Sequence, residues 1–246
     1  MKYAKADQNF VNRVRLDSTP TPHPDAVVTT GDARFTFLTE RLVRVEWAPE
    51  GAFDSRGSYA FPTRYNPAPP RVKISRAKGI ITMATGSLTV SYRQNAGRFN
   101  RNNLSISLRV GRRKRTWRPG MADNGNLLGA RRTLDGCLNE SEIDPGILSR
   151  SGWTLFDDSG TVRFDDKTGW IADPADGWNS TNPPQDWYFF GYGHDYKSAL
   201  RDYTMFGGKV PLIPRYMLGL WWSRYWDYTA QDLKDIVRLF DTYSIP

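Results

Sequence analysis

The first half of the chain alternates apolar and polar residues over short runs. In residues 41–47 (RLVRVEW), apolar side chains are interleaved with Arg41, Arg44 and Glu46, close to the period of two expected for a half-buried strand. Such runs recur about every 8–12 residues with turn dipeptides between them, which is typical of an antiparallel sandwich. The pattern predicts strands within AVVTTG (26–31), ARFTFLT (33–39), RLVRVEW (41–47), RVKIS (71–75), IITMAT (80–85), SLTVSYR (87–93) and LSISLRV (104–110).

Two segments interrupt the alternation and predict loops. Residues 62–70 (PTRYNPAPP) hold four prolines, which cannot donate ladder hydrogen bonds, so this stretch is expected at the surface. Residues 121–151 are rich in Gly, Asn and Asp, and a connection of this length is commonly functional or disordered.

A further strand is expected in residues 152–160 (GWTLFDDSG), ending in an acidic turn. Asp157-Asp158 and Asp165-Asp166 could be mistaken for catalytic pairs, but neighbouring side chains on a strand point to opposite faces. The turn interpretation is favoured for both pairs.

The last 60 residues differ in kind, since positions 187–246 hold 16 of the 33 aromatic residues. A helix is predicted after the N-cap Asp195, with Leu200, Tyr203 and Met205 as apolar positions and Gly207-Gly208 as its end. Residues 210–226 (VPLIPRYMLGLWWSRYW) predict a buried strand. An amphipathic helix capped by Thr229 follows, with apolar positions 233, 236, 237 and 240.

Composition indicates a soluble, folded protein. The 246 residues are 39% hydrophobic and 13% aromatic, with a mean hydropathy of −0.59, which argues against a membrane-spanning chain and against disorder. The single Cys137 excludes an intramolecular disulfide, and the separation of His23 from His194 disfavours a histidine metal site. We therefore expect no metal and no cofactor.

The N-terminus MKYAKADQNF lacks the apolar core of a secretory signal, so a cytoplasmic location is expected. Secretion is left open, because the sequons at Asn103, Asn139 and Asn179 would then be glycosylation acceptors.

The net charge of +8 comes from one segment. Residues 98–118 contain eight basic residues and no acid, and the other 26 basic residues match the 26 acidic ones in number. Such a cluster suits either nucleic acid or a solvated hairpin. The hairpin is favoured because the sequence alternates before the turn at Val110-Gly111. The segment also has few aromatic residues on which bases could stack, namely Phe99 and Trp117. No nucleic-acid or membrane partner is expected.

Common catalytic motifs are absent from the sequence: it has no phosphate loop, HExxH, CxxC or GxSxG. His194 beside Asp195 suggests acid–base chemistry, but a lone histidine in an aromatic loop is more commonly structural.

Residues 187–246 nevertheless resemble the junction of glycoside hydrolase family 31, which includes α-glucosidases and α-xylosidases. The matching features are Tyr-Phe-x-Gly before a short helix, the Pro-x-x-Pro run, and a helix ending in Ile245-Pro246. Upstream, similar segments are RFTFLTERLVRVEWAPEGAFDSR, NLLGARRTLDG and DPGILSRSGWTLFDDSG. The likeness runs from about residue 26 to the end.

The resemblance implies a mainly β fold: an antiparallel galactose-mutarotase-like β-sandwich, then the first βα unit of a truncated (β/α)8 barrel. The expected divisions are an N-terminal extension at 1–25, the sandwich at 26–186, and the junction with the incomplete barrel at 187–246. The parent protein would be a retaining α-glycosidase acting on α-linked glycosides, without a cofactor. The remainder of the barrel would be its partner.

The family's catalytic aspartates lie on later barrel strands, so the resemblance predicts no catalytic residue in this chain. Tyr228 and Trp226 are candidates for stacking on sugar, or for packing at the barrel rim. Asp135 and Arg132, in the long loop, are candidates for binding sugar hydroxyls, or for pairing with each other. A non-catalytic carbohydrate-binding sandwich is the alternative.

Overall fold

The computed structural model describes residues 18–129, 141–165, 170–174, 178, 180–210, 212–219, 221 and 223–245. The chain divides into two compact units, Met1–Gly208 and Lys209–Pro246. Within the described residues, the larger unit holds every strand, and the smaller unit holds the short helix η3 and the helix α3.

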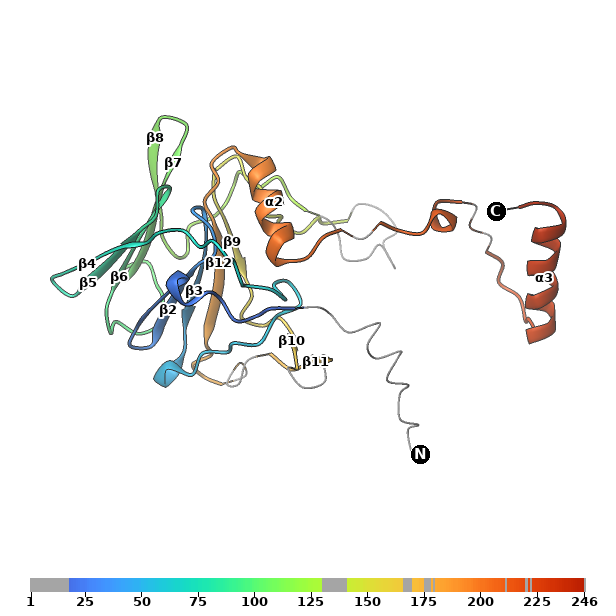
Figure 1. Ribbon diagram of the computed structural model, residues 1–246, viewed down its shortest axis with the longest axis horizontal. Coiled ribbons are helices and arrows are strands. Elements are labelled where there is room, and N and C mark those ends of the chain that lie inside the picture. Colours follow the sequence, from blue (N-terminus) through green and yellow to red (C-terminus); the bar gives the residue numbers. More distant parts are fainter. Residues whose placement is uncertain are drawn as a thin grey trace. The chain divides into compact units, whose positions relative to one another are not determined.

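Two five-stranded antiparallel sheets dominate the larger unit (Figure 1). One has the order β1-β2-β3-β12-β9 and the other the order β4-β5-β6-β7-β8; β10 and β11 form a small hairpin. All seven strands predicted by alternation are present, as is the hairpin after Val110. The bounds are β1 Val27–Thr30, β2 Ala33–Phe37, β3 Leu42–Trp47, β4 Lys73–Ala77, β5 Ile80–Ala84, β6 Leu88–Arg93, β7 Leu104–Val110, β8 Arg113–Trp117, β9 Thr154–Asp157, β10 Arg163–Phe164, β11 Ile171–Ala172 and β12 Gln185–Phe190.

One hydrophobic core joins the two sheets. Phe35 and Val45 from the first sheet belong to the same buried cluster as Ile81, Val90 and Ile106 from the second. In β6 and β7, buried residues alternate with partly exposed ones, as expected for strands of a sheet that has one buried face. The larger unit is therefore an antiparallel β-sandwich.

Strand β3 departs from the predicted half-buried pattern, because all six of its residues are buried. A second apolar cluster, which includes Leu42, Phe61, Tyr188 and Phe206, lies on the other side of the first sheet. Loop residues and α2 contribute to that cluster and exclude water from the outer face. The polar positions of β3 are consequently inside the protein.

Helix α2, Tyr196–Phe206, begins and ends where the sequence predicts. Asp195 accepts a hydrogen bond from the Ser198 amide, and Gly207 is the C-cap. The apolar positions were partly wrong: Leu200 and Met205 are 47% and 44% exposed. The buried residues are Ala199, Asp202 and Phe206. The buried face of the helix is therefore rotated about the helix axis relative to the predicted one.

Glycines allow the connection between β12 and α2 to pack closely against neighbouring segments. A Cβ on Gly191 would lie 2.5 Å from Leu88 Cδ2, and one on Gly152 would lie 2.5 Å from Val110 Cγ2. Gly193, at φ +60°, donates its amide hydrogen to Gly152 O. These contacts let the 191–195 turn lie directly against the end of β7.

Strand β12 crosses the boundary expected at residue 186. It pairs with β3 on one side and β9 on the other, and so is an interior strand of its sheet. By compactness, residues 187–208 group with the sandwich, and the division falls after Gly208.

The smaller unit holds η3, Arg215–Leu218, and α3, Ala230–Thr242. The strand predicted over 210–226 was wrong: the described residues there form no strand. A strand needs a neighbour for its ladder, and no described residue of this unit supplies one. Helix α3 is confirmed, with a reciprocal capping box between Thr229 and Asp232. Its predicted apolar positions Leu233 and Val237 are exposed.

The two predicted loops contain no described strand beyond single bridges. Residues 62–70 form no strand, but the surface prediction was only partly right, because Pro62 and Arg64 are buried and Arg64 donates to Tyr188 Oη. Asn66 anchors the more exposed remainder by donating to Leu38 O. The two described ends of the long loop, 121–129 and 141–151, pair with each other through the bridge between Asn126 and Ser149. Short 3-10 helices span Pro24–Ala26 and Pro49–Gly51. No helix in the described ranges has the length and apolarity needed to span a bilayer.

Candidate functional site

The four sugar-contact candidates have different outcomes. Trp226 is 63% exposed, and the Arg224 guanidinium carbon lies 4.4 Å from its ring centroid. Tyr228 is half-buried in the same unit. Arg132 and Asp135 lie outside the described residues. All four assignments stay predictions.

His194 and Asp195 have structural partners. The exposed His194 ring places Nε2 3.0 Å from Arg150 O. Asp195 caps α2 and accepts a 2.7 Å bond from Arg41 Nη1. The hydrogen bond with Ser198 and the Arg41 bond hold the pKa of Asp195 below its ordinary value. The pair thus organises the turn between β12 and α2, in line with the structural interpretation.

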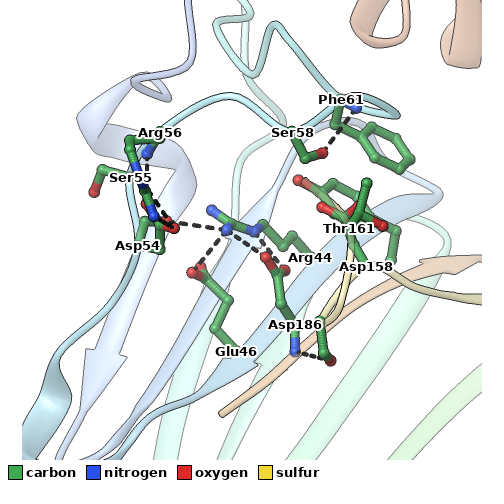
Figure 2. A network of polar contacts seen from close by, with 12 residues as sticks. Arg44, Glu46, Asp54, Ser55, Arg56, Ser58, Phe61, Asp158, Thr161 and Asp186 are labelled. Carbon is green, nitrogen blue, oxygen red and sulfur yellow. Dashed lines mark hydrogen bonds and ion pairs between the residues drawn. The ribbon is translucent and has the colours of Figure 1, made fainter. Parts of the chain in front are cut away.

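The largest polar feature that the sequence did not reveal is a buried network on the outer face of the first sheet (Figure 2). Arg44 donates through Nε and Nη2 to both carboxylate oxygens of Asp186, each at 2.7 Å. Its Nη2 also lies 3.0 Å from Glu46 Oε1. Arg34, directly opposite Glu46 in the register, donates two more bonds to that carboxylate at 2.8 and 2.6 Å. These contacts link β2, β3 and β12.

The network continues from Asp186 to the turn after β9. Arg163 lies 3.1 Å from Asp186 Oδ2, 3.5 Å from Asp158 Oδ2 and 3.4 Å from Asp54 Oδ2. Arg163 and Asp158 are both fully buried. Buried charges require such pairing, because each unpaired ion would carry a large desolvation cost. The network therefore ties the 54–64 loop and the turn after β9 to the sheet.

The two buried aspartates have opposite electrostatics. Burial, together with the negative charge of Asp186, raises the pKa of Asp158 to about 6. Burial also opposes ionisation of Asp186, but the charge and hydrogen bonds of Arg44, with Arg64 and Arg163, hold its pKa below the ordinary value. Separated pKa values can mark an acid–base pair. Here Asp158 is 0% and Asp186 6% exposed, so neither carboxyl can reach a substrate in this structure.

As predicted, Asp157 and Asp158 point to opposite sides: Asp157 is exposed and Asp158 buried. The carboxylate that accepts two hydrogen bonds from Arg44, Asp186, lies 142 residues away in the sequence, which is why local spacing could not find this pair. The only available signal was the placement of Arg44 and Asp186 within otherwise apolar runs.

A second polar feature is exposed and lies beside the β7–β8 hairpin. A groove of about 680 Å³ lies along one side of the hairpin, and a second groove of about 670 Å³ lies along the other. Lys114 and His194 line both grooves. The first is lined also by Arg41, Arg109, Thr85, Ser87 and Ser107, and the second by Arg113, Arg115, Arg150 and Ser151.

Two further possibilities, glycosylation at the sequons and a metal site, can be compared with the structure. Asn103 is 6% exposed and donates to the carbonyls of Ala96 and Arg98, so its sequon is closed to glycosylation in the folded protein. Asn139 and Asn179 lie outside the described residues. Within the described part of the chain, no cluster of three or more His, Cys, Asp or Glu side chains is arranged to hold a metal ion.

A scan against protein-family models gives no match, and no curated protein sequence is significantly similar to the chain. Similar solved structures include a GH31 dextranase of Flavobacterium johnsoniae complexed with glucose, at 15% identity and TM-score 0.47, covering 87% of this chain and 30% of that chain. A mutant of the same dextranase complexed with isomaltotriose gives the same values. A GH31 α-xylosidase from a soil metagenome, complexed with xylose, matches at 16% identity and TM-score 0.47, covering 89% of this chain. This chain spans 30% to 38% of the length of these enzymes.

Proposed function

We propose that this chain is the N-terminal region of a retaining, α-glucosidase-like glycosidase that hydrolyses α-linked glycosides. The order of elements carries the proposal. An antiparallel sandwich ends in β12, a glycine turn leads into α2, and a proline-flanked run precedes the capped helix α3. This is the order that the sequence resemblance to glycoside hydrolase family 31 implies. The mutarotase-like topology and the barrel are part of the proposal.

In this proposal the chain supplies a scaffold and sugar contacts, and the catalytic aspartates come from barrel strands outside these 246 residues. A retaining glycosidase needs one carboxylate as nucleophile and another as acid/base, both reaching the scissile bond. Asp158 and Asp186 cannot act in these roles because they are buried and bound to arginines. The inaccessibility of these carboxyls supports the expectation that the chain alone is inactive.

The proposed sugar contacts use two kinds of chemistry. The exposed ring of Trp226, together with Tyr228, would stack on the apolar face of a pyranose. Arg132 and Asp135 would make charge-assisted hydrogen bonds to sugar hydroxyls. The described ends of the 121–151 loop are paired through the bridge between Asn126 and Ser149, and loops carried on a rigid scaffold commonly hold binding residues, which supports this use of the loop.

The test compares two purified proteins on 4-nitrophenyl α-glucoside and α-xyloside. One is the 246-residue chain, and the other is the same chain extended through the coding sequence that follows it. We expect turnover only by the extended protein, with the α-anomer as the first product seen by NMR. Turnover by the 246 residues alone, or an extended protein inactive on both substrates, would contradict the proposal.

A further inference from the structure

The β7–β8 hairpin carries charge that has no function inside the fold. Cross-strand register pairs Arg109 with Lys114 and Val110 with Arg113. Arg109, Arg113, Lys114 and Arg115 are all exposed, and among the described residues none of them forms an ion pair with an acid. In Figure 1 the hairpin projects beyond the neighbouring strands of its sheet. Positive charge therefore surrounds a protruding element.

Alternation along the hairpin places its cations on both faces. Arg109 and Lys114 line the first groove, whereas Arg113 and Arg115 line the second, with Lys114 shared. The acid nearest in the lining, Asp195, is already bound to Arg41 at 2.7 Å. An anion entering either groove meets several cations and no unpaired lining carboxylate, which is the electrostatic complement of a polyanion.

The rest of the first groove narrows the class of polyanion. Its lining includes Thr85, Ser87 and Ser107. Thr85 Oγ1 donates to Glu40 O, and Ser107 Oγ lies 2.9 Å from Thr116 Oγ1, so these two hydroxyls keep further hydrogen-bonding capacity only as acceptors or shared partners. The apolar lining residues Leu88, Leu108 and Tyr192 are all buried, at 1%, 2% and 6% exposure. A peptide would need an apolar anchor pocket, and single-stranded nucleic acid would need exposed aromatic faces for its bases. Cations and hydroxyls dominate the side chains that reach the groove surface, because these three apolar side chains are buried, and such a lining suits a ligand that is itself rich in hydroxyls and anions.

We propose that the grooves beside the β7–β8 hairpin bind an acidic oligosaccharide through its carboxylates, with Arg109 and Lys114 as the principal contacts. The volume of about 680 Å³ lies within the range of sites for small ligands. The site is formed by the sandwich unit alone. It is therefore independent of the glycosidase activity proposed above, and either can fail without the other.

The test measures binding of hexagalacturonate to the full 246-residue chain by calorimetry. The variant Arg109→Gln/Lys114→Gln removes two groove cations. The control Lys73→Gln/Arg76→Gln removes two exposed cations from β4, the opposite edge strand of the same sheet, with the same change in net charge. Melting temperatures establish that both variants are folded.

We expect the groove variant to bind at least about tenfold more weakly and the control to bind within about twofold of the wild type, because charge-assisted hydrogen bonds act at contact distance. Maltohexaose, which is neutral, should not bind. Hexaglutamate and a thymidine hexanucleotide should bind more weakly than hexagalacturonate. Equal loss in both variants, equal binding of the three anions, or no binding of hexagalacturonate would overturn the proposal.

Discussion

The substitution Arg44→Met tests the buried network most severely. Arg44 is 1% exposed and holds Asp186 with two 2.7 Å bonds and Glu46 at 3.0 Å. Methionine fills most of the volume but supplies no charge. Two carboxylates buried beneath loops would then lose a shared cation.

The magnitude follows from what remains. After the change Asp186 keeps Arg163 at 3.1 Å, and Glu46 keeps Arg34 at 2.6 Å. Removing one partner of a buried ion pair costs about 3–5 kcal/mol, and with the surviving partners the expected loss is about 4 kcal/mol. For a domain of this size that corresponds to a fall in melting temperature of about 10 °C.

The matched control is Arg41→Met, which breaks an ion pair with Asp195 of the same 2.7 Å length but 37% and 45% side-chain exposure. An exposed pair contributes much less stability than a buried one, because solvent screens the two charges. Urea unfolding followed by tryptophan fluorescence gives both values. The loss in Arg44→Met should also shrink below about pH 5, because Asp186, whose pKa Arg44 helps to hold below its ordinary value, then protonates more readily and escapes its burial cost. Equal losses in the two variants, or a loss that does not change with pH, would refute the reasoning.

Three further predictions address other parts of the molecule. In Asp158→Asn, stability relative to the wild type should rise between pH 4 and pH 7. The folded pKa of about 6 lies above the ordinary 3.8, so the folded wild type keeps a proton that the unfolded chain releases, and its stability falls by up to about 3 kcal/mol as pH rises through this window. Denaturation at both pH values measures the difference between the two proteins, and a difference that does not change with pH would contradict the prediction. Gly152→Ala should be less stable than Gly79→Ala by about 1–3 kcal/mol. Both glycines have positive φ, but only at Gly152 would the added Cβ lie 2.5 Å from Val110 Cγ2. Equal melting temperatures of the two variants would contradict this packing argument. The chain should self-associate at high concentration unless a partner covers its exposed apolar residues, and Leu218→Glu/Val237→Glu should reduce this self-association. Light scattering that shows a monodisperse wild-type monomer would contradict the prediction.

The sequence predicted the parts of the fold that depend on local pattern. Strand alternation and turn dipeptides located the seven N-terminal strands, because every second residue of a strand points to the same face and the inward face is apolar. Thr229 and Asp195 predicted their helix starts, since a cap interacts within three residues. The N-terminal strands and both helices were therefore accessible without knowledge of the tertiary structure.

Features that depend on distant partners were not predictable in the same way. The alternation predicted that Arg44 and Glu46 would lie on the solvent-exposed face of their strand. That face is instead covered by an apolar cluster that includes Phe61, Tyr188 and residues of α2. The phase of α2 was misjudged because the sandwich, and not the helix sequence, decides which side is buried. Residues 210–226 are apolar enough for a strand, yet no described neighbour in their unit offers a ladder. Arg132 and Asp135 lie outside the described residues and stay predictions.

The most direct test of the glycosidase proposal is the coding sequence that follows the codon for Pro246, read from messenger RNA of the source. The account predicts an apolar strand pattern carrying an aspartate immediately after Ile245-Pro246, then further alternating strands and helices, in the same reading frame or in an adjoining one. A stop codon at that position, with no adjoining frame that encodes such units, would contradict the assignment of this chain to the N-terminal region of an α-glycosidase.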